Sequence, residues 1–389
     1  YGSIVNVDAC DWDVLEKFVD DLGTTGQISF ESVGNEETQK CLRKLVRVAQ
    51  YLEQKYDAVV TNPPYMGASG MEAKLSKYVK NNFPDSKSDM STVMMERALE
   101  MSKKLGYVSM INIPVWMTLK SYAKMRNMLL NNITIENLVH FGRGVFGSDF
   151  GTTAFVLKKN FTEGYNSTFR KLYLKQGAVS TLSEKERLYL SDIGYYIVNQ
   201  SKFKEIDGSP IAYALNENII NAFQNERKVA DIGTTRLGMT TADNNKFTRL
   251  WSEVVFDKLI TNATCKEDVI KYRKKWVPYN KGGQYRKWYG NNDVIVNWEN
   301  DGYEIKNFAD DRGHIRSTVP NTEYYFKKCI TWSKVTAGSI AFRYKTNGSI
   351  FDVAGASLFA DGENLLYLQG FLNSKVALSI LNVLSPTLN

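Results

Sequence analysis

The tetrapeptide Asn62-Pro63-Pro64-Tyr65 carries groups that suit one kind of chemistry. The amide oxygen of Asn62 and a main-chain carbonyl, that of Pro63, can each accept a hydrogen bond from the same exocyclic amine. These two hydrogen bonds draw the nitrogen towards a tetrahedral geometry. The two prolines stiffen the segment and keep it extended. The Tyr65 ring can stack on a planar base. These groups are suited to hold an adenine flipped out of a DNA duplex and to activate its amine.

The tetrapeptide needs a strand to place it, and the flanking sequence predicts a buried strand over residues 56–61. Further strands are expected over 107–113, 133–141 and 152–158, and helices over 37–54, 89–104 and 121–130, with Gly106 capping the second helix. Strands joined by such helices indicate a mostly parallel, doubly wound α/β sheet. Ligands of such sheets bind beyond the carboxyl ends of the strands. The tetrapeptide stands at one of these ends.

The composition is that of an ordinary globular protein. The chain has 389 residues, of which 43% are hydrophobic and 23% charged, so two domains are expected. No apolar run is long enough to span a bilayer, which predicts no membrane partner. The four cysteines and two histidines are far apart, so neither a metal site nor a thiol-catalytic site is predicted. A cytoplasmic, reducing location is expected.

The second half of the chain holds most of the excess positive charge. The formal net charge is +7; residues 225–389 hold 23 Lys and Arg against 17 Asp and Glu, whereas residues 1–224 hold 26 against 25. Between Lys266 and Lys287 eight basic residues are interleaved with Tyr and Trp. For any single residue a solvated surface face is the more frequent arrangement. The segment as a whole indicates nucleic-acid binding, because basic groups bind phosphates and aromatic rings pack on bases.

A domain boundary is expected where the charge changes and where Gly208-Ser209-Pro210 breaks the pattern. Residues 1–210 are predicted to form the α/β domain, 211–231 a connecting segment with a helix over 216–225, and 232–389 a mixed α+β domain. Its predicted elements are strands over 329–333, 339–344 and 350–353 and a final helix from near Gly370. The basic residues predicted to contact DNA are Arg236, Lys246, Lys281, Arg286, Lys287, Lys334 and Arg343.

Longer strings carry a resemblance to a known family. Asn-Pro-Pro-Tyr is followed by Lys-Ser-Asp before a helix, by Gly-Tyr-Val-Ser-Met-Ile-Asn-Ile-Pro, by Phe141-Gly142-Arg143-Gly144-Val145-Phe146 and by Thr152-Thr153-Ala154-Phe155. This order resembles that of the gamma-class N6-adenine DNA methyltransferases with a single-chain restriction-modification layout. Pro64-Tyr65-Met66-Gly67 and Lys275-Trp276-Val277-Pro278-Tyr279 further resemble the methyltransferases of bacteriophage-exclusion (BREX) systems. The similarity spans nearly the whole chain.

The resemblance implies a Rossmann-like catalytic domain that binds S-adenosylmethionine, followed by a target recognition domain that reads double-stranded DNA. It implies other BREX components as partners, in phage defence that marks host DNA, and it places residues 142–146 and 151–153 near the catalytic face. Such enzymes hold the methyl donor with a glycine-rich turn, and none precedes Asn62. We therefore expect a fragment with a partial catalytic domain, cofactor-binding residues upstream of Tyr1 and a recognition domain truncated at its C-terminal end. This piece alone is expected to be inactive.

Three alternatives stay open at this point. An RNA or protein-glutamine methyltransferase could use the same tetrapeptide, although the basic and aromatic second half argues against a protein substrate. The chain could be the methyltransferase half of a bifunctional restriction-modification enzyme. It could also be a non-catalytic DNA-binding component that retains the fold.

Overall fold

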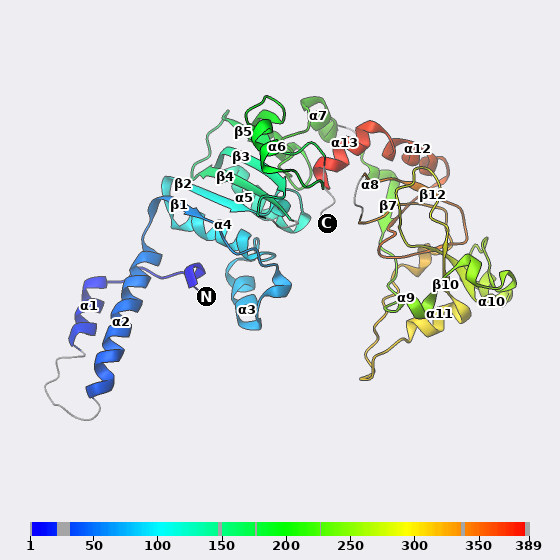
Figure 1. Ribbon diagram of the computed structural model, residues 1–389, viewed down its shortest axis with the longest axis horizontal. Helices are drawn as coiled ribbons and strands as arrows, with labels where there is room; N and C mark the ends of the chain where they lie inside the picture. Colours follow the sequence, from blue (N-terminus) through cyan, green and yellow to red (C-terminus); the bar gives the residue numbers. More distant parts are fainter. Residues whose placement is uncertain are drawn as a thin grey trace. The chain divides into compact units, whose positions relative to one another are not determined.

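The computed structural model of the chain (Figure 1) describes residues 2–21, 32–146, 150–175, 177–225, 227–335 and 339–385. The chain divides into two compact units. Unit 1 comprises Tyr1–Leu174 and Val179–Ala214, and unit 2 comprises Lys175–Ala178 and Leu215–Asn389. The assignment of a catalytic part and a recognition domain to these units stays a prediction.

Unit 1 is built on one six-stranded sheet. Its strands are β1 (Tyr56–Thr61), β2 (Ser102–Asn112), β3 (Thr134–Arg143), β4 (Gly151–Lys158), β5 (Asn166–Lys171) and β6 (Tyr195–Asn199). Its α-helices are α1 (Trp12–Asp21), α2 (Ser32–Glu53), α3 (Ala73–Asn82), α4 (Met90–Met101), α5 (Ala123–Asn132) and α6 (Leu182–Tyr189). Short 3-10 turns include η1 (Gly2–Ile4), η3 (Pro114–Met117) and η5 (Gln200–Glu205). Helices α1 and α2 lie side by side (Figure 1), where Gln39 Nε2 donates to the Val19 carbonyl oxygen at 2.9 Å.

The strand order is β1-β2-β4-β3-β5-β6. β1, β2, β3 and β5 run in one direction, while β4 and β6 run in the other. β4 is reversed because residues 144–150, which connect it to β3, are too few for a crossover helix. The predicted doubly wound α/β sheet is confirmed, and β4 and β6 are its antiparallel members.

Two details of unit 1 differ from the prediction. The sequence predicts a buried strand at β1, but β1 is the first strand in the sheet order and Val60 is 76% exposed. Gly106 does not cap α4, because the helix ends at Met101 and Gly106 lies within β2. A Cβ at Gly106 would lie 3.0 Å from the Asp57 carbonyl oxygen of β1. Glycine is therefore needed there for the close approach of two backbones.

The main core of unit 1 packs one face of the sheet against α4 and α5. Leu138 of β3 and Trp116 of η3 are fully buried, and Phe155 of β4 is 1% exposed. The rings of Trp116 and Phe155 meet edge to face with centroids 5.6 Å apart. These apolar contacts fix the strands that carry the tetrapeptide and its neighbours.

A buried arginine ties two loops to this core. Arg126 of α5 is 1% exposed. Its guanidinium donates to the carbonyl oxygens of Trp116 at 2.8 Å, Leu119 at 2.7 Å, Gly208 at 2.7 Å and Ser209 at 3.1 Å. Burial lowers the pKa of Arg126 to about 10. The side chain therefore stays charged at neutral pH and supplies donors to four carbonyl groups of two other segments of the chain.

His140 of β3 is held neutral within an aromatic cluster. Its Nδ1 lies 3.0 Å from the Tyr213 hydroxyl, and its ring meets Tyr173 edge to face at 5.0 Å. Burial, and then the charges of Lys171 and Lys185, lower the pKa of His140 from 6.5 to about 3. The unfolded chain therefore takes up this proton near pH 6.5 and the folded chain only near pH 3. The contribution of neutral His140 to stability is therefore fully present above pH 6.5 and is lost progressively as the pH falls from 6.5 towards 3.

We expect acid to destabilise the chain partly through this one group. One proton taken up only by the unfolded state costs at most about 1.4 kcal/mol per pH unit, so lowering the pH from about 7 to about 5 should cost roughly 1–2 kcal/mol through His140. Urea titrations at the two pH values measure the difference. His140→Gln should reduce this pH dependence. Equal pH dependence of His140→Gln and the native chain would contradict the assignment.

Unit 2 combines two four-stranded sheets with short helices. Its strands are β7 (Gly233–Arg236), β8 (Thr248–Leu250), β9 (Trp276–Asn280), β10 (Val294–Asn297), β11 (Cys329–Thr331), β12 (Arg343–Lys345), β13 (Ile350–Phe351) and β14 (Ser357–Ala360). Its helices are α7 (Glu217–Asn225), α8 (Val229–Ile232), α9 (Asn244–Phe247), α10 (Lys266–Lys271), α11 (Glu299–Lys306), α12 (Gly362–Leu372) and α13 (Lys375–Leu384). The sheet orders are β13-β9-β10-β8 and β12-β11-β14-β7. The predicted mixed α+β class is confirmed.

The C-terminal helices of unit 2 differ from the prediction. The sequence predicts one final helix from near Gly370, but Gly370 lies inside α12 and a second helix, α13, follows. The break comes at Ser374, whose hydroxyl accepts from the Ala377 backbone N–H at 3.1 Å and caps α13. An N-terminal serine cap satisfies a donor that the first helical turn leaves unpaired. The apolar spacing continues across the break, which is why the sequence suggested a single helix.

Candidate functional site

The tetrapeptide lies at the carboxyl end of β1. Thr61, the last residue of β1, pairs with Met110 of β2. Pro63 is buried and Tyr65 is half-buried, whereas Asn62 and Pro64 are exposed. The tetrapeptide is therefore accessible at the edge of the sheet where α/β proteins bind ligands. The catalytic roles of its residues stay predictions.

Tyr65 fixes the direction of the Asn62 amide. The Tyr65 hydroxyl donates to Asn62 Oδ1 at 2.9 Å and lies 3.4 Å from the carbonyl oxygen of Ile111 in β2. Burial raises the pKa of Tyr65, so its hydroxyl stays protonated and can donate. An amide oxygen has two lone pairs. Asn62 therefore keeps one acceptor position for another donor, in a direction that Tyr65 sets.

The loop after the tetrapeptide is anchored to the start of α4. The Met90 backbone N–H donates to the Met66 carbonyl oxygen at 2.8 Å, and that of Ala68 donates to Ser88 at 3.0 Å. Asp89 caps α4 by accepting from the Ser91 backbone N–H at 2.9 Å. The Lys-Ser-Asp string of the sequence is therefore a helix cap that also holds the tetrapeptide loop.

Phe150 is a site neighbour that the sequence analysis did not single out. Its ring meets the Tyr65 ring edge to face, with centroids 5.3 Å apart, and its side chain is 41% exposed. Phe150 directly precedes β4, which pairs with β2. Phe150 lies one residue before the range 151–153, which the resemblance places near the catalytic face. A single exposed phenylalanine before a strand gives no signal of its own in the sequence.

A pocket of about 650 Å³ opens beside Asn62. Its lining includes residues 61–64, the η1 turn and four apolar side chains, Met66, Leu75, Met90 and Met94. Neither Tyr65 nor Phe150 is among the described residues that line it. The pocket and the Tyr65–Phe150 ring pair are therefore distinct surfaces that meet at Asn62. The lining also carries two charged residues, Glu72 and Lys74.

The predicted DNA contacts of unit 2 differ in exposure. Lys246, Arg286 and Lys334 are exposed, and Arg236, Lys281 and Lys287 are half-buried. Some of the half-buried side chains have partners: Arg236 lies over the Tyr324 ring at 4.8 Å, and Lys287 Nζ donates to the Asn373 carbonyl oxygen at 2.8 Å. Lys281 donates to Asn244 Oδ1.

Arg343 has a different position from the other six. It is 1% exposed, and burial lowers the pKa of its guanidinium. The guanidinium lies 3.3 Å from Ser333 Oγ and 3.5 Å from the carbonyl oxygen of Arg286, to which it donates. A phosphate cannot approach a side chain buried in this way. Arg343 is placed to support the backbone at Arg286 rather than to meet DNA itself.

The segment 281–292 forms a surface loop that is rich in aromatic and basic residues. Tyr285, Trp288 and Tyr289 are 58%, 49% and 69% exposed. Lys345, which is 6% exposed, donates to the carbonyl oxygens of Gly290 and Asn291, each at 3.0 Å. The loop is therefore held in one shape by a buried ammonium group, a contact that the spacing of the sequence does not reveal.

The described part of the chain has neither a helix suited to cross a membrane nor a cluster of metal-binding side chains. None of its helices combines the length and the apolar character needed to cross a bilayer. Its His, Cys, Asp and Glu side chains form no group of three that could hold a metal ion.

Comparisons with known proteins agree with the resemblance. Residues 9–146 match the family of the Eco57I restriction-modification methylase. The adenine-specific methyltransferase PglX of Lacticaseibacillus casei (strain Zhang) is 36% identical over 100% of this chain and 33% of PglX. The adenine-specific methyltransferase BrxX of Escherichia coli O9:H4 (strain HS) is 33% identical over 100% of this chain and 31% of BrxX.

The fold is shared with a solved structure. The type IIL restriction-modification enzyme MmeI, in complex with DNA, has a TM-score of 0.50 at 10% identity, covering 84% of this chain and 43% of MmeI. At that identity the comparison supports the fold alone. The chain spans about a third of the length of the two curated relatives. The predicted resemblance is confirmed: along its whole length this chain is a homologue of a part of the adenine-specific methyltransferases PglX and BrxX.

Proposed function

We propose that this chain is part of a site-specific DNA adenine-N6 methyltransferase that takes its methyl group from S-adenosylmethionine. The observation that carries the proposal is the Asn62 amide oxygen, exposed at the end of β1 and directed by the Tyr65 hydroxyl at 2.9 Å. Asn62 Oδ1 and the Pro63 carbonyl accept the two hydrogens of a flipped adenine amine and raise its nucleophilicity. S-adenosylmethionine supplies an electrophilic methyl group when it is bound.

The remaining site residues position the base. Tyr65 and Phe150 offer aromatic surface on which adenine can pack, and such stacking contributes about 1–3 kcal/mol per base in single-stranded sites. This offsets part of the cost of unpairing the base. Pro64 keeps the segment extended, so the two acceptors do not have to reorganise when the amine arrives.

Unit 2 binds double-stranded DNA in this proposal. Arg236, Lys246, Lys281, Arg286, Lys287 and Lys334 supply phosphate contacts, and three of them, Lys281, Arg286 and Lys287, belong to the aromatic 281–292 loop. The DNA in the MmeI complex supports the same use of a related fold. In the whole protein the activity serves phage defence by marking host DNA, together with other BREX components.

A prediction for DNA binding compares Arg286 of unit 2 with an exposed cation of unit 1. We expect Arg286→Gln to weaken binding to all duplexes alike and to reduce the slope of log affinity against log salt by about one. Fluorescence anisotropy of the complete protein at several salt concentrations measures the slope. Lys44→Gln, which changes an exposed cation on α2, serves as the matched control. An unchanged slope for Arg286→Gln would remove Arg286 from the DNA contacts.

Base-resolution methylation sequencing tests the proposal as a whole. Cells that carry the gene for the complete protein are expected to contain N6-methyladenine in one sequence context, and cells without the gene are expected to lack it. Methylated RNA or protein with unmodified DNA would favour an RNA or protein-glutamine methyltransferase. Unmodified DNA in cells that still resist phage would favour a non-catalytic DNA-binding component.

A further inference from the structure

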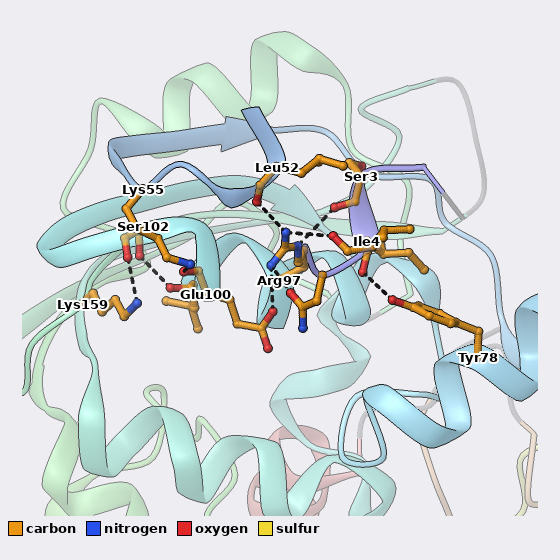
Figure 2. Close-up of polar contacts among 12 residues, drawn as sticks. Ser3, Ile4, Leu52, Lys55, Tyr78, Arg97, Glu100, Ser102 and Lys159 are labelled. Carbon is orange, nitrogen blue, oxygen red and sulfur yellow. Dashed lines mark hydrogen bonds and ion pairs between the residues drawn. The ribbon is translucent and has the colours of Figure 1, made fainter. Parts of the chain in front are cut away.

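A side chain of α4 holds residues 3–6, the chain segment before α1, in place. Arg97 of α4 is 2% exposed, and Figure 2 shows its guanidinium between the residues of this segment and the end of α2. It donates to the carbonyl oxygens of Ser3 at 3.3 Å and Val5 at 2.9 Å, and to Asn6 Oδ1. It also donates to the Leu52 carbonyl oxygen at 2.9 Å. One side chain thereby joins two parts of the sequence that are far from α4.

Other contacts hold the same segment. The Tyr78 hydroxyl of α3 donates to the Ile4 carbonyl oxygen at 3.3 Å (Figure 2). The Ile4 side chain is 2% exposed and packs with Met71, Val79 and Met90. A single 3-10 turn, η1, is too short to be stable by itself. Its position therefore depends on the groups of α3 and α4 that bind its backbone.

Burial of the charged Arg97 guanidinium costs more free energy than its packing contacts alone would offset. Among the described residues its ionic partner is Glu100, at 3.1 Å, whose side chain is 38% exposed. A buried charge is tolerated when its donors are satisfied, and here three of the acceptors belong to one segment: the carbonyl oxygens of Ser3 and Val5, and Asn6 Oδ1. The side chain therefore fixes the shape of residues 3–6 as well as their location.

This segment forms a wall of the pocket beside Asn62. Gly2, Ser3 and Ile4 line the pocket together with residues 61–64. The Tyr65–Phe150 ring pair, where the base is proposed to pack, does not line it. In-line transfer requires the methyl donor and the adenine amine that accepts the methyl group to approach Asn62 from different directions. The pocket is then the side from which the methyl donor reaches Asn62.

We propose that Arg97 is a positioning residue that holds residues 3–6 as the wall of the methyl-donor pocket. This rests on the proposed function. The ligand is the adenosyl part of S-adenosylmethionine, which contacts the wall and the Met66, Met90 and Met94 side chains. Arg97 itself does not touch the donor; it acts through the backbone of the segment.

A matched pair of variants in the complete protein tests the inference. Arg97→Lys and Arg126→Lys each keep a charge and lose most of their bonds to carbonyl oxygens, and both residues are buried in unit 1. Only Arg97 borders the pocket wall. We expect Arg97→Lys to raise the Kd for S-adenosylhomocysteine, measured by calorimetry, by about 10-fold or more, which corresponds to about 1.4 kcal/mol. Arg126→Lys should leave that Kd within about 2-fold.

The accompanying measurements distinguish the possible failures. The Kd for a DNA duplex should stay unchanged in Arg97→Lys, and KM for the methyl donor should rise more than kcat falls. Tyr78→Phe, which deletes one bond to the segment, should raise the same Kd by about 2-fold to 5-fold even if Arg97→Lys does not fold. Unchanged affinity in both variants, or weaker DNA binding instead, would overturn the inference. If the native protein neither binds S-adenosylhomocysteine nor methylates DNA, the proposed function itself fails.

Discussion

Asn62→Ala is expected to lower the kcat of methylation by the complete protein by about 100-fold to 1,000-fold, the usual effect of deleting one polar group that stabilises a transition state. The substitution removes an acceptor that the amine needs most when its nitrogen becomes tetrahedral. It also leaves the Tyr65 hydroxyl without the oxygen to which it donates at 2.9 Å. Incorporation of a labelled methyl group into a duplex under single-turnover conditions measures the loss.

The controls for this prediction separate chemistry from folding. Asn132→Ala removes another exposed asparagine amide, at the end of α5, and should leave kcat unchanged. Asn62→Asp keeps an oxygen acceptor in the same position and should retain more activity than Asn62→Ala. Sequence-specific DNA binding should persist in all three variants. Native kcat in Asn62→Ala would exclude the proposed role of the tetrapeptide.

Arg126→Met is expected to lower the free energy of unfolding of unit 1 by about 3–5 kcal/mol, as large as the loss on breaking a buried ionic contact. The methionine fills most of the volume but offers no donor, so the carbonyl oxygen of the buried Trp116 loses its donor, and those of Leu119 and Gly208, which are exposed residues, each lose one as well. A buried carbonyl oxygen left without a donor costs about 1–3 kcal/mol, and each lost hydrogen bond adds to this. Urea unfolding of the chain, followed by a unit 1 tryptophan signal from Trp116, measures the change.

An exposed arginine is the matched control for Arg126. Arg43 of α2 pairs with Asp20 at 2.8 Å, and both side chains are more than half exposed. Arg43→Met should change stability by less than about 1 kcal/mol, because an exposed ion pair is screened by water. Similar losses for the two variants would mean that the carbonyl contacts of Arg126 contribute little.

Local patterns were sufficient to predict the elements around the tetrapeptide. β1 has the predicted bounds, 56–61, and α4 and α5 match the predicted helices within about two or three residues. Apolar spacing carries this information because each residue's burial follows from the period of its own element. The Gly106 prediction failed because its cause, a close backbone on β1, lies some fifty residues away in the sequence.

The rest of the candidate site depends on contacts between distant residues. Phe150 reaches Tyr65 only because β4 enters the sheet between β2 and β3. In the sequence, Arg97 looks like any other polar residue of an amphipathic helix. Its contacts with Ser3 and Leu52 arise only in the folded chain. Arg343, by contrast, is a cation in a basic region whose burial depends on unit 2 packing. Charge alone does not tell a surface arginine from one that supports a loop.

The outer edge of β1 has a consequence for handling the chain. β1 pairs with β2 on one side and is the first strand of the described sheet, with Val60 76% exposed. An open edge offers backbone donors and acceptors to any strand that approaches it. Strand pairing at this edge is therefore a route by which copies of the chain are expected to associate as the concentration rises. A lysine in place of Val60, whose side chain is exposed on one face of β1, would oppose such pairing without altering the tetrapeptide.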